Sequence, residues 1–235
     1  MVWWAIVFII ILGCAGALAY ACIIPSSQVF APVVNRGPAV SRSVTLTFDD
    51  GPAPPFTERV LDILGEHNIS ATFFLCGKNV ERHPEIARRI VREGHIVGNH
   101  TYSHPFLFAR SRRFMAEEID RTQEVIRRVT GVRPTLFRPP YGARWFGLMP
   151  VLRQRGLKMV MWSVAGSDWK YNTEAIVRVT TRRVHPGAVV LLHDGHEQPP
   201  RGGIDQSSTV EALPAIIEAV SRAGLTFASI EKTVL

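Results

Sequence analysis

Residues 44–52, Val-Thr-Leu-Thr-Phe-Asp-Asp-Gly-Pro, lead from an apolar strand directly into two adjacent carboxylates and a turn. Asp50 and Gly51 are typical turn residues before a proline, so a turn accounts for them. A turn does not account for Asp49, because neighbouring carboxylates repel each other and resist burial at the end of a strand. The pair therefore predicts a compensating cation at this strand end.

Outward from this stretch, strand-like segments alternate with segments that carry apolar residues at helical spacing. This alternation predicts a parallel sheet, and strands that are apolar almost throughout predict a sheet covered on both faces. We expect an α/β fold, a closed (β/α) barrel of about seven strands. The rival is an open doubly wound sheet, but the glycine-rich phosphate loop typical of that fold is missing after the first strand. The expected strands are residues 44–48, 71–76, 96–98, 135–137, 159–164, 188–192 and 226–230. The expected helices are residues 56–67, 84–93, 113–130, 146–154, 173–184 and 210–222.

Polar side chains gather directly after five of these strands, and a parallel barrel brings such strand ends to one face. His100 and His104 are four residues apart, so one helical turn would present both to a metal; two surface histidines are the alternative. His193 ends a buried strand, either as a core histidine bonded to the backbone or as a catalytic group. Arg138 is either a surface arginine or a bidentate partner for a catalytic carboxylate.

Together these clusters contain one Asp and two His suited to a divalent metal, and they leave one Asp and one His unligated. Three protein ligands leave an open coordination position, which is the arrangement of catalytic rather than structural metal sites. An Asp base and a His acid beside such a metal predict metal-assisted hydrolysis of an acyl bond.

The N-terminus holds 23 consecutive residues without a charge, residues 2–24. A helix that spans a bilayer needs ~20 apolar residues, whereas the core of a signal peptide usually has roughly 7–15. We therefore favour an uncleaved membrane anchor (residues 1–24) over a signal peptide cut after Ala21, although no Lys or Arg precedes the run to define its orientation. Residues 25–41 are expected to be a linker and residues 42–235 the catalytic domain, which should fold without the first 35 residues. That domain would be extracytoplasmic and membrane-anchored, or secreted if the segment is cleaved.

The overall composition excludes several other classes of protein. The chain has 235 residues, of which 46% are hydrophobic and 20% charged, as in an ordinary globular domain. Its formal charge of +7 suits anionic surroundings, but no run of Lys and Arg is long enough for a nucleic-acid patch, so we expect no nucleic-acid partner. Of the three cysteines only Cys76 lies in the domain, which therefore cannot close an internal disulfide.

Five motifs, in this order, resemble those of the polysaccharide deacetylases, carbohydrate esterase family 4, which carry the NodB homology domain. The motifs are TFDDGP at residues 47–52, HTYSH at 100–104, RPPYG at 138–142, SDW at 167–169 and LLH at 191–193. The resemblance covers roughly residues 42–235, and each motif follows or ends an expected strand. The family fold is a distorted (β/α) barrel with fewer than eight regular strands, in agreement with the strand pattern.

The resemblance implies a role for each residue of the expected metal site. Asp50, His100 and His104 match the metal ligands, usually for zinc, although two His and one Asp also accept cobalt, nickel or manganese. Asp49 matches the base that takes a proton from the attacking water. His193 matches the acid that protonates the leaving amine.

The remaining motif residues match supporting roles in the family. Arg138 matches the residue that orients the base, and Asp168 the aspartate that tunes the acid histidine. Trp169 matches a wall of the substrate groove, and the backbone N–H of Tyr141 would help to hold the oxyanion. The pocket for the acetyl methyl group would be lined by Leu191 or Leu192.

The resemblance implies a metal-dependent hydrolase that removes N-acetyl groups from a GlcNAc-containing glycan, peptidoglycan or chitin-like, without cutting peptide bonds. One departure is Ala165, where many members have an aspartate, and it bears on groove contacts or sugar preference rather than on the metal ligands. Two alternatives remain: a hydrolase of a small non-sugar amide on the same fold, and a membrane-tethered carbohydrate-binding protein without activity.

Overall fold

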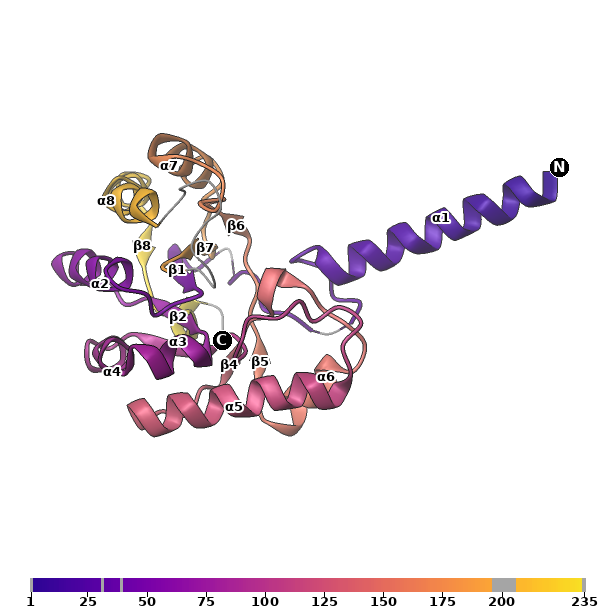
Figure 1. Cartoon of the computed structure of the whole chain (residues 1–235). Helices are drawn as coiled ribbons and strands as arrows, with labels where there is room; N and C mark the ends of the chain where they lie inside the picture. The colour runs from indigo at the N-terminus through magenta and orange to yellow at the C-terminus, as the bar shows by residue number, and fades with distance from the viewer. Residues whose placement is uncertain (1, 31, 39, 196–205, 234–235) are drawn as a thin grey trace.

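The centre of the molecule is a curled sheet in which every strand pairing is parallel. A computed structural model describes residues 2–30, 32–38, 40–195 and 206–233. Seven strands follow the order β5-β4-β3-β2-β1-β7-β6, and β8 pairs with the first two residues of β1 (Figure 1). The strands are β1 (Ser43–Asp49), β2 (Thr72–Leu75), β3 (Ile96–Asn99), β4 (Leu136–Phe137), β5 (Lys158–Met159), β6 (Val164–Ala165), β7 (Val189–His193) and β8 (Thr226–Phe227).

Helices surround the curled sheet on its outer side, and a long N-terminal helix projects away from it (Figure 1). The helices are α1 (Val2–Ile23), α2 (Phe56–Glu66), α3 (Gly77–Arg82), α4 (Pro84–Arg92), α5 (Arg112–Thr130), α6 (Leu148–Gln154), α7 (Thr173–Thr181), α8 (Ser207–Arg222) and α9 (Ile230–Thr233), with a 3₁₀ turn at Pro140–Gly142. The short helix α3 was not expected, because six residues are too few to show a helical period. The expected strand at 226–230 ends at Phe227, and the chain then turns into α9.

The sheet closes on itself through one continuous run of chain. β5 and β6 are the two ends of the strand path, yet they are joined directly by residues 160–163, so the single strand expected at 159–164 is divided in two. Its beginning pairs with β4 and its end pairs with β7. This change of partner completes the expected distorted (β/α) barrel.

The two faces of β1 explain why a polar residue can end this strand. Val44, Leu46 and Phe48 belong to the core cluster beneath the outer helices. Thr45 and Thr47 alternate with them on the inner side, and both are fully buried. Each hydroxyl donates to a backbone carbonyl, that of Thr45 to Ala228 and that of Thr47 to Val190. The interior of the barrel therefore accepts polar groups that have a partner, and Asp49 lies on this side.

The apolar helix α1 is exposed along most of its length but is fixed to the domain at its C-terminal end. Among the described residues it alone is long and apolar enough to cross a membrane. Ala21 and Cys22 are buried at its last turn. The guanidinium of Arg144 donates to the carbonyls of Ile24 and Ser27, and the backbone N–H of Arg144 donates to Cys22 O. These bonds satisfy carbonyl groups that a helix end leaves without partners.

Part of the expected linker is built into the barrel. Val34 forms a parallel bridge with Val160: its N–H donates to Met159 O over 3.0 Å, and its carbonyl accepts from Met161 N over 2.7 Å. Val33 is buried in a core cluster together with Leu107. Val33 and Val34 of the expected linker therefore contribute to the core and to the barrel, because the chain between β5 and β6 has backbone groups that this segment pairs with.

A chain that begins at Arg36 should consequently be less stable than one that begins at Pro25, although both lack α1. The shorter chain loses the buried side chain of Val33, at about 1.5–3 kcal/mol, and two backbone hydrogen bonds of Val34, at about 1 kcal/mol each. We expect a free energy of unfolding about 3–5 kcal/mol lower, measured by urea denaturation. Equal urea midpoints for the two chains would show that the segment is a free linker.

Candidate active site

The two neighbouring aspartates both face the mouth of the barrel, because the strand ends between them. Asp49 is the last residue of β1, and Asp50 has a φ of 74°, in the left-handed region. Asn79 holds this turn by donating to the backbone carbonyl of Asp50 over 2.7 Å. The carboxylates of Asp49 and Asp50 lie 3.7 Å and 3.3 Å from Nε2 of His100. The two side chains therefore do not point apart, as a continuing strand would have required.

His100 and His104 are brought together by a loop rather than by a helical turn. Thr101 and His104 have φ values of 66° and 55°, and the loop follows β3 directly. Asn99 sets its start: its side-chain oxygen accepts from Thr101 N, and its amide donates to Ile119 O on α5. The imidazole centroids of the two histidines are 5.0 Å apart. The helical reason for pairing them was wrong, but their joint placement was right.

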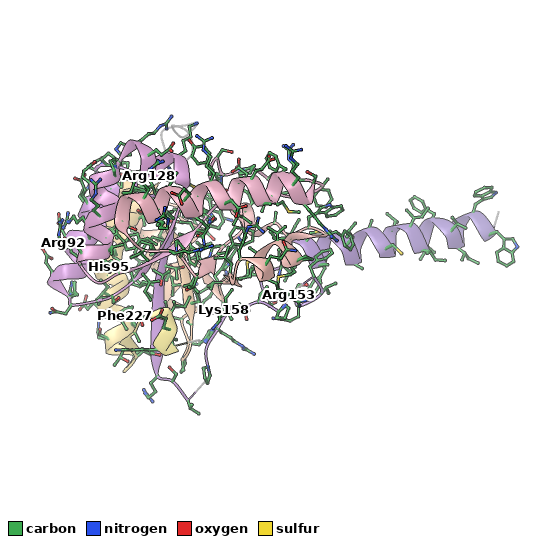
Figure 2. All side chains as sticks on the ribbon, turned by 90° about the horizontal axis from the view of Figure 1, so that it is seen from below. Arg92, His95, Arg128, Arg153, Lys158 and Phe227 are labelled. Atoms are coloured by element: carbon green, nitrogen blue, oxygen red, sulfur yellow. The ribbon has the colours of Figure 1, made fainter. Side chains whose placement is uncertain are left out.

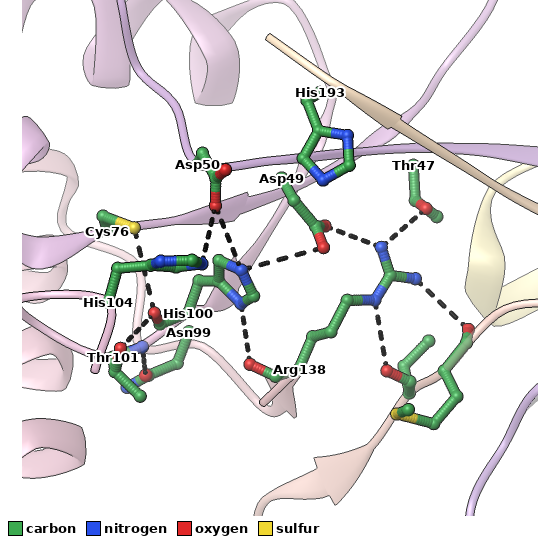
Figure 3. Close-up of polar contacts among 12 residues, drawn as sticks. Thr47, Asp49, Asp50, Cys76, Asn99, His100, Thr101, His104, Arg138 and His193 are labelled. Atoms are coloured by element: carbon green, nitrogen blue, oxygen red, sulfur yellow. Dashed lines mark hydrogen bonds and ion pairs between the residues drawn. The ribbon is translucent and has the colours of Figure 1, made fainter. Parts of the chain in front are cut away.

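Asp50, His100 and His104 form a buried cluster whose ligand atoms all lie within 4.8 Å of one another (Figure 3). Nδ1 of His100 donates to the backbone carbonyl of Arg138 over 2.7 Å, so the lone pair of its Nε2 faces Asp50. Oδ1 of Asp50 is buried without a hydrogen bond, 3.3 Å and 3.1 Å from the two Nε2 atoms. One carboxylate oxygen and two imidazole nitrogens around a common point fit a divalent metal such as zinc.

The charge state of the cluster suits a cation. Burial acts to raise the pKa of Asp50, but the neighbouring His104 and His100 outweigh it and hold that pKa well below its usual range. Asp50 is thus a carboxylate at any physiological pH. A metal ion bound there would polarise an amide carbonyl and lower the pKa of a water molecule.

Arg138 is fully buried and holds the other aspartate, Asp49, in place (Figure 3). Its Nη1 donates to Asp49 Oδ1 over 2.6 Å and to Thr47 Oγ1 over 2.8 Å. Its Nε and Nη2 donate to the carbonyls of Val160 and Met161, each over 3.2 Å. The expected bidentate pair with the carboxylate is therefore not formed, because Nε and Nη2 donate to backbone carbonyls between β5 and β6.

His193 and Asp168 form a second charged pair beside the metal cluster. His193 Nδ1 lies 2.8 Å from Asp168 Oδ1, and the backbone N–H of His193 donates to Asp168 Oδ2 over 2.7 Å. Thr209 donates to the same oxygen over 2.9 Å. Burial alone would lower the pKa of His193, but Asp168, with Asp50 and Asp49, raises it to about 10. In the metal-free protein the pKa of His193 therefore favours the imidazolium, which is in a position to act as an acid.

The expected substrate contacts lie at the rim, with one exception. Tyr141, with a φ of 58°, places its exposed ring 4.7 Å from that of His104. Half-exposed Trp169 meets His193 edge to face at 5.4 Å. Leu192 instead belongs to the core cluster under the outer helices, since alternate strand residues face opposite sides. Only Leu191, which shares the inner side with His193, can reach the site.

Several supporting residues were not found from the sequence. Thr47 binds Arg138, Asn99 shapes the histidine loop, and Thr209 fixes Asp168 from α8. Thr47 could have been found from the sequence, because it is a polar residue on the same side of the strand as Asp49. Thr209 carries no such signal, because it lies 41 residues from its partner in the chain.

The sequence profile described as "Polysaccharide deacetylase" matches residues 36–160 of this chain. The chain belongs to the polysaccharide deacetylase family. It is 38% identical over 198 residues to a peptidoglycan-N-acetylglucosamine deacetylase of Bacillus cereus, covering 83% of this chain and 69% of that protein. It is 37% identical to the peptidoglycan deacetylase PgdA of Listeria monocytogenes, where the match covers 88% of this chain but only 41% of the relative. A chitooligosaccharide deacetylase of Rhizobium leguminosarum is also 37% identical, with 80% of this chain and 90% of that protein covered.

Solved structures share the fold across most of the polysaccharide deacetylase domain. The Bc1960 peptidoglycan N-acetylglucosamine deacetylase superposes with a TM-score of 0.79 at 36% identity, covering 86% of this chain and 92% of that one. A pseudoenzyme of the same esterase family from Bacillus anthracis reaches a TM-score of 0.78 at 28% identity, covering 86% and 68%. An enzyme and a pseudoenzyme share this fold, so activity depends on the residues of the site.

Replacing His100 by Ala should weaken zinc binding at least about tenfold, because loss of a ligand costs no less than loss of a ligand's hydrogen-bond partner. Isothermal titration of the metal-stripped protein measures this. His67→Ala, on an exposed histidine outside the site, is the matched control and should bind zinc like the parent chain. Equal zinc affinity of the two variants would contradict the assignment of His100 as a ligand.

Replacing Asp168 by Asn should destabilise the metal-free protein more at pH 6 than at pH 10. A histidine whose pKa is raised in the folded state stabilises fully below its unfolded pKa of ~6.5 and loses this contribution as the pH rises through its folded value. For His193 that window ends at about 10, and Asp168 maintains it. Urea unfolding of both proteins at the two pH values gives the difference. A pH-independent difference would show that Asp168 acts only as a neutral hydrogen-bond acceptor.

Proposed function

We propose that this chain is a metal-dependent hydrolase that removes N-acetyl groups from a GlcNAc-containing glycan, cleaving a carbon–nitrogen bond that is not a peptide bond. The observation that carries the proposal is the complete cluster at the barrel mouth. A buried Asp-His-His set is flanked by Asp49, held by Arg138, and by His193, held by Asp168. The relatives with deacetylase names support the same class of reaction.

The two flanking residues divide the proton transfers between them. Asp49 accepts a proton from the water that attacks the acetamide carbonyl, and Arg138 keeps that carboxylate aimed at the site. The backbone N–H of Tyr141 supports the oxygen that becomes negative as the carbonyl is attacked. His193 gives its proton to the departing nitrogen, so that the carbon–nitrogen bond breaks with release of acetate and a free amine. Leu191 lines the space for the acetyl methyl group.

For the metal we propose zinc, since imidazole and carboxylate ligands suit it; cobalt, nickel and manganese fit the same donors. For the substrate we propose a cell-wall glycan, peptidoglycan or a chitin-like chain, with Trp169 and Tyr141 stacking against sugar rings at the rim. Ala165 on β6, where many members of the family have an aspartate, lines a cavity together with Trp162 and Arg183.

We propose that α1 is retained as a membrane anchor with the domain outside the cytoplasm. In the folded domain Ala21 and Cys22 are buried, and the backbone N–H of Arg144 donates to the carbonyl of Cys22. Cleavage there would leave a charged amino terminus in a buried position, which is unfavourable. An anchored domain also argues against a small cytosolic amide as the substrate. A binding protein without activity is the remaining alternative, because the fold accommodates a pseudoenzyme.

Asp49→Asn should leave zinc affinity nearly unchanged and lower kcat by roughly 10²–10⁴-fold, the usual contribution of a positioned base. Asp50→Asn should instead weaken zinc binding, and added zinc should partly restore turnover. Acetate release from N-acetylated glycan oligomers, with bound zinc measured in parallel, separates the two roles. Asp62→Asn, on an exposed aspartate paired with Arg89, is the control and should match the parent chain. Full activity of Asp49→Asn would refute the mechanism, and no acetate release by the parent chain from either glycan class would favour the binding protein.

A further inference from the structure

Exposed and partly buried aromatic side chains form a connected surface beside the C-terminal end of α1. Phe108 meets Trp145 with ring centroids 4.3 Å apart, Trp145 meets Phe146 at 5.1 Å, and Phe146 meets Phe30 at 4.8 Å. Phe146 is 60% and Phe108 37% exposed, and neighbouring Val29 is 69% exposed. We call Val29, Phe30, Phe108, Trp145 and Phe146 the aromatic patch. Large apolar side chains gathered on a surface mark a contact with a partner or a membrane.

Arg144 connects the aromatic patch to the end of α1. Arg144 directly precedes Trp145 and Phe146, and it binds the carbonyls of Cys22, Ile24 and Ser27 at the end of α1. Its side chain is fully buried. The helix projects away from the domain (Figures 1 and 2), and its C-terminal end contacts Arg144, the residue directly before Trp145 and Phe146 of the patch. A bilayer that contains α1 must meet the domain at this junction.

Cations border the junction on two sides. Arg110 lies just before α5 and Arg112 is its first residue. The side chain of Arg112 approaches Gly147, next to the aromatic patch. On another side a cavity is lined by residues that directly follow α1, Pro25 and Ser26, together with Arg36, Arg183 and His185. Within the described ranges none of these four arginines forms an ion pair with an acidic side chain. Arginines without an acidic partner, next to the point where α1 leaves the domain, match the negative headgroups of an anionic bilayer.

We propose that the aromatic patch and these arginines seat the domain on the surface of an anionic phospholipid bilayer, at the point where α1 enters it. The inference rests on the proposed anchor role of α1. Aromatic side chains prefer the membrane–water interface, and arginines beside them add attraction to anionic lipid. Phe106 links the aromatic patch to Tyr141, because its ring centroid lies 6.0 Å from that of Phe108 and 5.8 Å from that of Tyr141. The mouth of the active site therefore lies next to the aromatic patch.

A sugar chain is the other occupant that aromatic rings could bind. The patch differs from a glycan groove in its neighbours, since it is continuous with an apolar helix and bordered by arginines that have no acidic partner among the described residues. These neighbours favour the bilayer.

The test places the photoreactive residue benzoylphenylalanine in the full chain in phosphatidylcholine vesicles that contain phosphatidylglycerol. One variant carries it in place of Phe146. A second carries it in place of Ile9, an exposed residue of α1, and a third in place of Val132, which is 37% exposed just beyond the far end of α5. We expect lipid adducts at positions 9 and 146, with a yield at 146 several-fold above that at 132. The yield at 146 should fall when phosphatidylglycerol is omitted.

Adducts at position 9 together with equal yields at 146 and 132 would show that the aromatic patch does not contact the bilayer, while α1 would still be an anchor. No lipid adduct at position 9 would overturn the anchor and this inference with it, while acetate release still tests the deacetylase activity independently. A sugar adduct at position 146 with added GlcNAc oligomers, in place of lipid, would identify the patch as a glycan surface. A yield at 146 that does not depend on phosphatidylglycerol would overturn the recognition of anionic lipid.

Discussion

The buried guanidinium of Arg138 lies where β1, β4 and the chain between β5 and β6 come together. A charge taken out of water is tolerated only when it is paired and its remaining donors are satisfied, and here Asp49, Thr47 and two backbone carbonyls do this. The guanidinium also stacks on Phe74, 4.1 Å from the ring centroid. Losing one partner of such a pair typically costs about 3–5 kcal/mol, so the barrel and the position of Asp49 depend on the same contact.

The site is organised as two charged pairs on either side of the Asp-His-His cluster. In one pair the cation is buried deeply and the carboxylate faces the site. In the other the carboxylate is buried deeply and the imidazolium faces the site. Asp168 keeps His193 protonated, and Arg138 holds the carboxylate of Asp49 in place, so a proton donor and a carboxylate face the same space. A donor and an acceptor at one centre are what acid and base catalysis requires.

The sequence predicted the parts of this structure that depend on short segments and missed those that depend on contacts between distant ones. Strand–helix alternation and the polar residues at strand ends indicated the barrel and the members of the site. The left-handed backbone at Asp50, which turns both aspartates to one side, could not be read from the strand pattern. Nor could the contribution of Val34 to the barrel, since Pro, Ser and Gly around it are equally typical of a linker. Thr209 reaches Asp168 only because α8 packs over the sheet.

The order of strands along the chain has a consequence for how the protein is made. β1 is the first strand to leave the ribosome, but two of its three partners, β7 and β8, are the last. At a synthesis rate of roughly 5–20 residues per second, β1 waits on the order of ten to forty seconds for β8. Until β7 has been made, Asp49 lacks its neighbour His193, and until β8 has been made, the start of β1 lacks its partner. The barrel and its active site can therefore be completed only late in synthesis, whichever helices have formed before.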